Sequence, residues 1–184
     1  SRWLRALRRP GAVLALGLLA VALVGVRAWY GLGRLEGGAL LPSPEGAGDL
    51  WATYSQGWHD VATGAPTAAP PYLAVLTGIA GALLGSAPRA VEGLLMLAVP
   101  LAGVSAYLAL RGVVRGRGLR VLAAAAYALL PAVTGAMAAG RLGTAMLAVL
   151  LPPLVRVGVR VPERWRTAWG GALLLAAAAA FVPA

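Results

Sequence analysis

The side chains capable of chemistry gather in one segment, residues 38–71, of an otherwise apolar chain. This segment contains Asp49 and Asp60, the two aspartates of the sequence, and His59, its single histidine. A carboxylate can take a proton from an attacking hydroxyl group, or it can help to hold a divalent cation. His59 beside Asp60 could act as a base with its orienting carboxylate, or the two could be metal ligands. These three residues are the catalytic candidates of the sequence.

Each catalytic candidate also has a purely structural interpretation. Aspartate is a favoured N-cap residue, and Asp49 stands just before a short helical pattern that ends near residue 57 or 58. Asp60 fits a solvated loop charge equally well, and His59 fits an amphipathic residue at a membrane surface. The sequence leaves both interpretations open, and it leaves the presence of a metal undecided.

Four further residues are candidates for substrate binding. Trp51, Tyr54 and Trp58 recur at helical spacing, so their rings could stack on a sugar or anchor a helix at the bilayer surface. Arg141 stands at the end of a predicted helix, where it could hold a lipid phosphate or extend to the membrane surface.

The composition excludes an ordinary soluble domain. Hydrophobic residues make up 60% of the chain and charged residues 12%, with a mean hydropathy of +0.79. The apolar runs are continuous and not alternating, which predicts an all-α, polytopic transmembrane bundle and not a barrel. There is no cysteine for disulfides or thiolate sites. No nucleotide, dinucleotide or zinc motif is present, so we expect no cofactor site within this chain, with a divalent cation as the open alternative.

The net charge of +10 comes from arginines that flank the apolar runs. This placement is typical of topology signals, and we therefore expect no nucleic-acid partner.

We expect a single membrane domain: a cytoplasmic flank at residues 1–10, a transmembrane helix at 11–30, an exported loop with juxtamembrane or re-entrant helices at 31–90, and further transmembrane helices at 91–184. About five helices would span the bilayer. The chain begins with serine and stops inside an apolar run, so we expect a piece of a longer protein.

Arginine placement also predicts the topology. If residues 72–87 spanned the membrane together with 91–110, the arginines of residues 111–120 would lie outside, against the positive-inside rule. If residues 72–87 stay on the outer side, the cytoplasmic segments 1–10, 111–120 and 156–166 each hold four arginines. We therefore place the N-terminus in the cytoplasm and residues 31–90 on the outer face of the plasma membrane. The apolarity of 72–87 alone does not decide whether it spans.

Prolines and glycines predict how the helices pack. Pro100 and Pro131 lie at membrane depth and predict kinks. The Gly81–Gly85 spacing and Gly135 suggest places where helices approach closely.

Three stretches carry a resemblance to a known family: SQGWHDV, APPYLAVL and YALLPAVTGAMAAGRLGTA. They resemble the multi-pass half of large actinobacterial membrane glycosyltransferases, in which a family-2 glycosyltransferase domain joins a long polytopic region. The resemblance covers about residues 35–155. More distantly, the layout is similar to the GT-C fold of lipid-linked sugar transferases, including mycobacterial arabinofuranosyltransferases. There an exported loop after the first helix bears a catalytic aspartate, which Asp49 matches best by position and Asp60 second.

The resemblance implies a membrane-embedded part of a glycosyltransferase in cell-envelope polysaccharide or glycolipid assembly. Its partners would be the lipid bilayer, a polyprenyl-linked sugar donor on the outer face, and a glycan or lipid acceptor. The alternative is a non-catalytic membrane scaffold, or a flippase- or transporter-like module, that serves a catalytic domain elsewhere in the protein.

Overall fold

The structure, a computed structural model, describes residues 10–27, 45–56, 69–82, 85–160 and 166–181. The described part is helical and contains no strand, only the single bridge pair Gly46–Ser86. The predicted all-α class is therefore confirmed. The helices are α2 (Pro10–Gly25), α3 (Ala47–Ser55), α4 (Tyr72–Ala82), α5 (Ala87–Ala109), the 3-10 turn η2 (Leu110–Gly112), α6 (Arg117–Ala128), α7 (Pro131–Ala138), α8 (Leu142–Arg160) and α9 (Arg166–Phe181).

Two described helices are long and apolar enough to cross a bilayer. They are the continuous segment Ala87–Gly112 and α8, with 26 and 19 residues. The pair α6 and α7 gives a third span if the bent pair counts as one. Helices α2 and α9 have 16 residues each, or about 24 Å at 1.5 Å per residue. The described helices thus support a membrane protein, but five spans are not confirmed, and α2 ends at Gly25 where a helix to residue 30 was predicted.

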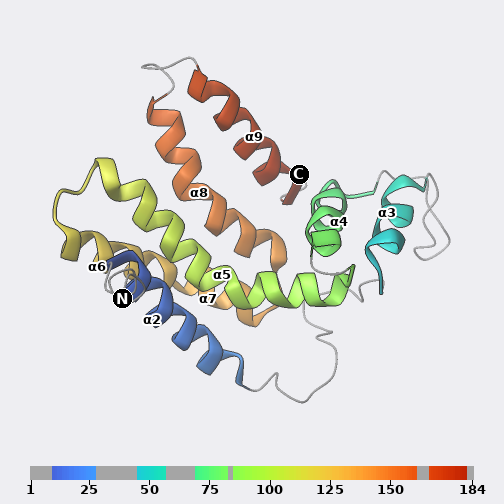
Figure 1. Cartoon of the computed structure of the whole chain (residues 1–184), viewed down its shortest axis with the longest axis horizontal. Coiled ribbons are helices and arrows are strands. Elements are labelled where there is room, and N and C mark those ends of the chain that lie inside the picture. Colours follow the sequence, from blue (N-terminus) through green and yellow to red (C-terminus); the bar gives the residue numbers. More distant parts are fainter. Residues whose placement is uncertain (1–9, 28–44, 57–68, 83–84, 161–165, 182–184) are drawn as a thin grey trace, which may run out of the picture.

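The break between α6 and α7 has a local cause in Pro131. A residue before proline avoids the helical region, and Leu130 is extended with ψ 141°. Pro131 then begins α7, and the two helices meet at an angle of 43°. The predicted kink at this position is confirmed. Pro100, by contrast, lies inside α5, which runs on without a break and curves in Figure 1.

Helix α5 forms the centre of the bundle and packs against α8, α2 and α6 (Figure 1). Its contact faces are rich in alanine, and Ala98, Ala102 and Ala106 are buried. Gly103 lies where α5 meets α2 and α6, since a Cβ there would collide with Leu18 and lie 3.2 Å from the Cβ of Ala128. Small residues at these positions allow the three backbones to approach closely.

The glycines that the sequence suggested as packing positions are different ones. A Cβ added at Gly81 or Gly135 would meet nothing within 4 Å. Gly85 has a φ of 79°, and its amide donates to the Ala80 carbonyl at 2.8 Å. Glycine is favoured there because it adopts a left-handed conformation without strain. The prediction of close helix contact through Gly81 is therefore wrong.

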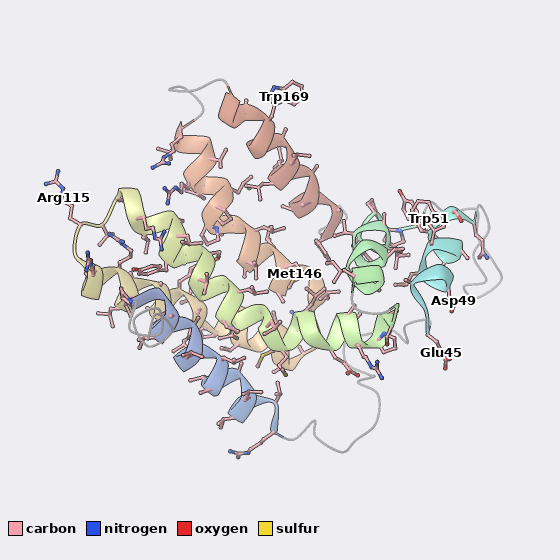
Figure 2. The ribbon with its side chains drawn as sticks, in the orientation of Figure 1. Glu45, Asp49, Trp51, Arg115, Met146 and Trp169 are labelled. Carbon is pink, nitrogen blue, oxygen red and sulfur yellow. The ribbon has the colours of Figure 1, made fainter. Side chains whose placement is uncertain are left out.

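The bundle has two ends of different charge. The N-terminal end of α2 meets the C-terminal end of α5, because a Cβ at Gly11 would lie 3.1 Å from Cε1 of Tyr107. The arginine-rich end, as we call it, carries Arg111, Arg115, Arg117, Arg120, Arg156 and Arg160. Among the described residues, Glu45 and Asp49 lie toward the other end (Figure 2), where the first turns of α5 carry Glu92 together with Arg89.

Helix α8 is longer than the sequence suggested. Residues 156–166 were predicted to be a loop, but α8 continues to Arg160 and includes Pro152 and Pro153. Arg156 donates hydrogen bonds from Nη1 to the carbonyl oxygens of Leu108 and Ala109. These carbonyls belong to the last turn of α5, where the Leu108 carbonyl also accepts a hydrogen bond from the Leu110 amide. An arginine inside α8 thus adds hydrogen bonds to the end of α5.

Helices α3 and α4 pack on each other at the end opposite the arginine-rich end. Leu50 anchors α3, with 1% of its surface exposed, in a cluster that includes Leu76, Leu95 and Met146. The Ala47 amide donates to Gly85 at 2.8 Å and the Ala87 amide to Glu45 at 3.3 Å. Helix α4 has 11 residues, about 16 Å, which is shorter than the hydrocarbon core of a bilayer.

We expect Leu50→Ala to loosen the α3–α4 pair. Deleting a buried leucine side chain costs about 2–5 kcal/mol, since it removes apolar contact and leaves a cavity. Amide hydrogen exchange measured by mass spectrometry should accelerate in α3 and α4 while α5 stays protected. Trp51→Ala is the matched control, because Trp51 is 54% exposed. Equal exchange in the two variants would contradict the anchoring role.

Candidate functional site

Asp49 lies in the first turn of α3, and its carboxylate has a local partner. Oδ2 accepts a hydrogen bond from the Gly46 amide at 3.1 Å. Gly46 is the N-cap and Asp49 is the third residue of the helix, so the predicted N-cap position is wrong by three residues. The side chain still caps the helix, since it satisfies an amide at the N-terminus and places negative charge near the positive end of the helix dipole.

Trp51 and Tyr54 form an aromatic pair on the same helix. Their ring centroids lie 5.6 Å apart with the planes tilted by 40°, and Trp51 is largely exposed. At 100° per residue, Trp51 and Tyr54 follow Asp49 by two and five residues and so lie roughly 160° and 140° around α3 from it, on the opposite side of the helix. Figure 2 shows Trp51 and Asp49 on different sides of α3. Helix α3 alone therefore does not bring the carboxylate and the rings into one site.

The other predicted site residues are only partly described. Trp58, His59 and Asp60 lie outside the described residues. Arg141 stands between α7 and α8, directly after Gly140, which has a φ of 67°. The Arg141 side chain is exposed, and in the described part of the chain it makes no ion pair with Asp49.

A divalent cation would need several carboxylate or histidine ligands close together. The described residues include no group of three or more His, Asp or Glu that could hold a metal ion. Asp49 uses one carboxylate oxygen to cap α3. The described part of the chain thus offers no metal centre by itself, while His59 and Asp60 lie outside it.

A second aromatic contact joins α4 to α9 near the α3–α4 pair. The rings of Tyr72 and Phe181 stack with centroids 6.4 Å apart and an angle of 24° between their planes. Burial raises the pKa of the Tyr72 hydroxyl above its ordinary value, because the charged form would lose solvent. The hydroxyl therefore stays neutral, and Tyr72 acts here as a packing residue.

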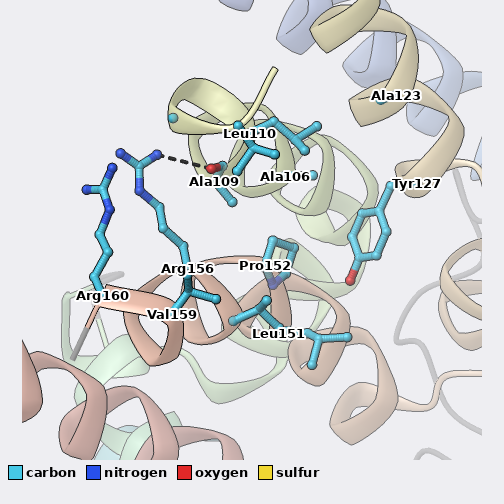
Figure 3. A pocket seen from close by; sticks show the side chains of 13 residues that line it. Ala106, Ala109, Leu110, Ala123, Tyr127, Leu151, Pro152, Arg156, Val159 and Arg160 are labelled. Atoms are coloured by element: carbon cyan, nitrogen blue, oxygen red, sulfur yellow. Dashed lines mark hydrogen bonds between the residues drawn. The ribbon is translucent and has the colours of Figure 1, made fainter. Parts of the chain in front are cut away.

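The structure also contains a cavity that the sequence did not indicate. It has a volume of about 620 Å³ and lies between the C-terminal part of α5, the middle of α6 and the C-terminal part of α8 (Figure 3). Its lining is mainly apolar: Ala106, Ala109, Leu110, Gly112, Val113, Ala123, Tyr127, Leu151, Pro152, Val155, Arg156, Val159 and Arg160. This size falls within the usual range of small-molecule sites.

The polar groups of this cavity have identified roles. The Tyr127 hydroxyl donates to the Ala148 carbonyl at 2.7 Å and so joins α6 to α8. Arg156 and Arg160 stand one turn apart on α8, and Figure 3 shows their guanidinium groups near each other at one side of the cavity. Pro152, Arg156 and Arg160 follow one another at intervals of four residues, and this spacing could have placed them on one face of a helix. It was missed because the arginines were assigned to a loop.

Comparison with known proteins provides no family for this chain. No family model matches it, and neither a curated protein nor a solved structure is significantly similar to it.

Proposed function

We propose that this chain is the membrane-embedded part of a glycosyltransferase that assembles cell-envelope polysaccharide or glycolipid. The observation that supports it best is the α3–α4 pair, which is too short to span and packs at the end of the bundle opposite the arginine-rich end. In this proposal the arginine-rich end faces the cytoplasm, by the positive-inside rule. Helices α3 and α4 then lie at the outer face of the plasma membrane.

This placement fits a substrate that is itself held in the bilayer. A polyprenyl-linked sugar carries its sugar at the membrane surface, at the level of the exposed Trp51 ring and its neighbour Tyr54. An aromatic face can pack against a sugar ring while its edge stays in the headgroup region. The acceptor, a glycan or lipid, would approach from outside. The resemblance of residues 35–155 to membrane glycosyltransferases favours this substrate class.

The proposed reaction needs a base near the acceptor. A carboxylate of residues 38–71 would take the proton from the acceptor hydroxyl as its oxygen attacks the anomeric carbon and the polyprenyl phosphate leaves. Asp49 is the first candidate by position, although it also caps α3, and Asp60 is the second.

A second function has an observation of its own. The Asp49 carboxylate is engaged with the Gly46 amide and faces away from Trp51 and Tyr54. This favours a non-catalytic scaffold, or a flippase- or transporter-like module, in which α3 is a surface element and chemistry occurs elsewhere in the protein. On that alternative, the carboxylates of the loop are dispensable for sugar transfer.

Sugar transfer by the complete protein tests the two functions against each other. Membranes containing the Asp49→Ala/Asp60→Ala double variant should lose transfer from a polyprenyl-linked donor, while Glu45→Gln, at a nearby exposed carboxylate, should keep it. Wild-type transfer by the double variant would refute the catalytic proposal and support the scaffold.

The orientation can be tested with single cysteines, since the chain contains none. We expect Gln56→Cys to react with a membrane-impermeant maleimide in intact cells, because Gln56 is exposed at the end of α3. Arg115→Cys, exposed at the arginine-rich end, should react only after the membrane is opened. Labelling of Arg115→Cys in intact cells would reverse the proposed orientation.

A further inference from the structure

We propose that the cavity between α5, α6 and α8 is a binding site for one anionic phospholipid. A hydrocarbon chain of the lipid occupies the apolar part, and its phosphate lies against Arg156 and Arg160. This inference does not rest on the proposed glycosyltransferase activity. The cavity adjoins the arginine-rich end, and the α3–α4 pair lies at the other end of α5 (Figures 1 and 3).

The walls of the cavity specify an apolar occupant. Alanine, valine, leucine and proline side chains from three helices line it. Two of these helices belong to the segments long and apolar enough to cross a membrane, and α6 belongs to the bent pair. A cavity bordered by such helices is next to lipid chains, and dispersion contacts favour filling it with one of them.

The arginines specify the charge of the head group. Arg156 and Arg160 both line the cavity, and the charge of Arg111 is near enough to act on Arg156 together with that of Arg160. Guanidinium groups bind phosphate oxygens through charge-assisted hydrogen bonds, so two of them at one side of the cavity favour an anionic head group. No carboxylate lines this cavity among the described residues, and Glu163 lies outside them.

Arg156 can hold the α5 carbonyls and a phosphate together. A guanidinium group has five N–H donors in a planar fork. Nη1 of Arg156 donates to Leu108 and Ala109, which leaves the remaining donors for phosphate oxygens. These bonds hold the side chain at the edge of the cavity, so less conformational entropy is lost when a phosphate binds.

The surrounding charge favours a phospholipid of the leaflet at this end. Arg111 and Arg120 lie over the ring of Tyr107, with their Cζ atoms 5.4 and 5.5 Å from its centroid. They add positive charge at the same end of α5 without lining the cavity. Basic residues at a membrane surface attract anionic lipids. A zwitterionic lipid of equal chain length would fill the same volume without this gain.

Lipid retention by the purified complete protein tests the site. The protein is delipidated in detergent, offered an equal mixture of phosphatidylglycerol and phosphatidylcholine with identical chains, and examined by native mass spectrometry. We expect wild type to retain one phosphatidylglycerol at least about fivefold over phosphatidylcholine. Arg156→Gln/Arg160→Gln should remove this preference, and Ala123→Trp, which fills the apolar part, should reduce retention of both lipids.

The matched control is Arg115→Gln/Arg117→Gln. It removes the same charge from the same end of the bundle, but neither residue lines the cavity. We expect it to keep the preference of wild type, with thermal unfolding used to confirm that each variant is folded. If the Arg156→Gln/Arg160→Gln variant does not fold, Ala123→Trp alone decides. Equal loss in the control, or unchanged retention in Ala123→Trp, overturns the proposal. So does retention of neither lipid by wild type, the result expected if another helix fills the cavity.

Discussion

Asp49→Asn in the complete protein should lower sugar transfer by about 100-fold or more while leaving α3 folded. A positioned general base contributes about 10²–10⁴ to a rate. Asparagine cannot take the proton, but its side-chain oxygen can still accept the hydrogen bond that the Gly46 amide donates to Asp49 at 3.1 Å. The substitution therefore separates catalysis from capping. Transfer is measured with a labelled polyprenyl-linked donor, and α3 is followed by amide hydrogen exchange.

Asp49→Ala provides the comparison, because it removes the base and the cap together. Loss of a capping side chain costs about 0.5–2 kcal/mol, so amide exchange in α3 should accelerate in this variant only. If Asp49→Asn transfers sugar normally and Asp49→Ala does not, Asp49 acts only as the cap of α3. Asp60→Asn then becomes the deciding variant. Normal transfer in all three would leave the scaffold function as the better explanation.

The position of Asp49 shows what the sequence could and could not predict about the site. A short helix with aromatic residues at helical spacing was predictable, because Leu50 needed burial and the aromatic residues favoured a surface. The start of α3 was not, since Gly46 takes the N-cap position through its pairing with Ser86, 40 positions later in the chain. The aromatic residues were expected to share a site with the carboxylate. The helix places them on another side.

Features of the bundle were predictable where they depend on residues close together in the sequence. Pro131 specifies the break between α6 and α7 through its effect on Leu130. The end of α8 was not predictable, because an arginine next to an apolar run usually marks a loop, whereas Arg156 is helical and its side chain binds the Leu108 and Ala109 carbonyls of α5. The cavity could not be predicted from the sequence either, because its walls come from three helices that are separate in sequence.

Gly103→Leu should destabilise the bundle more than a leucine at Gly93, the other glycine of α5. A Cβ at this position already collides with the Leu18 side chain and lies 3.2 Å from the Cβ of Ala128, so a whole leucine side chain would overpack the contact of α5 with α2 and α6. Overpacking of this kind costs about 1–3 kcal/mol. The melting temperature should then fall by about 2–12 °C for a chain of this length. Thermal unfolding of the purified protein measures it.

Gly93→Leu is the matched control within the same helix, because nothing lies within 4 Å of a Cβ there. It should unfold near the temperature of wild type. The decisive variant is Gly103→Leu/Leu18→Ala, which removes the side chain that the new leucine meets. Substitutions in direct contact are not additive, so the double variant should be more stable than Gly103→Leu alone. If Leu18→Ala gives no recovery, α2 does not pack on α5 at Gly103, and the antiparallel arrangement of these two helices is wrong.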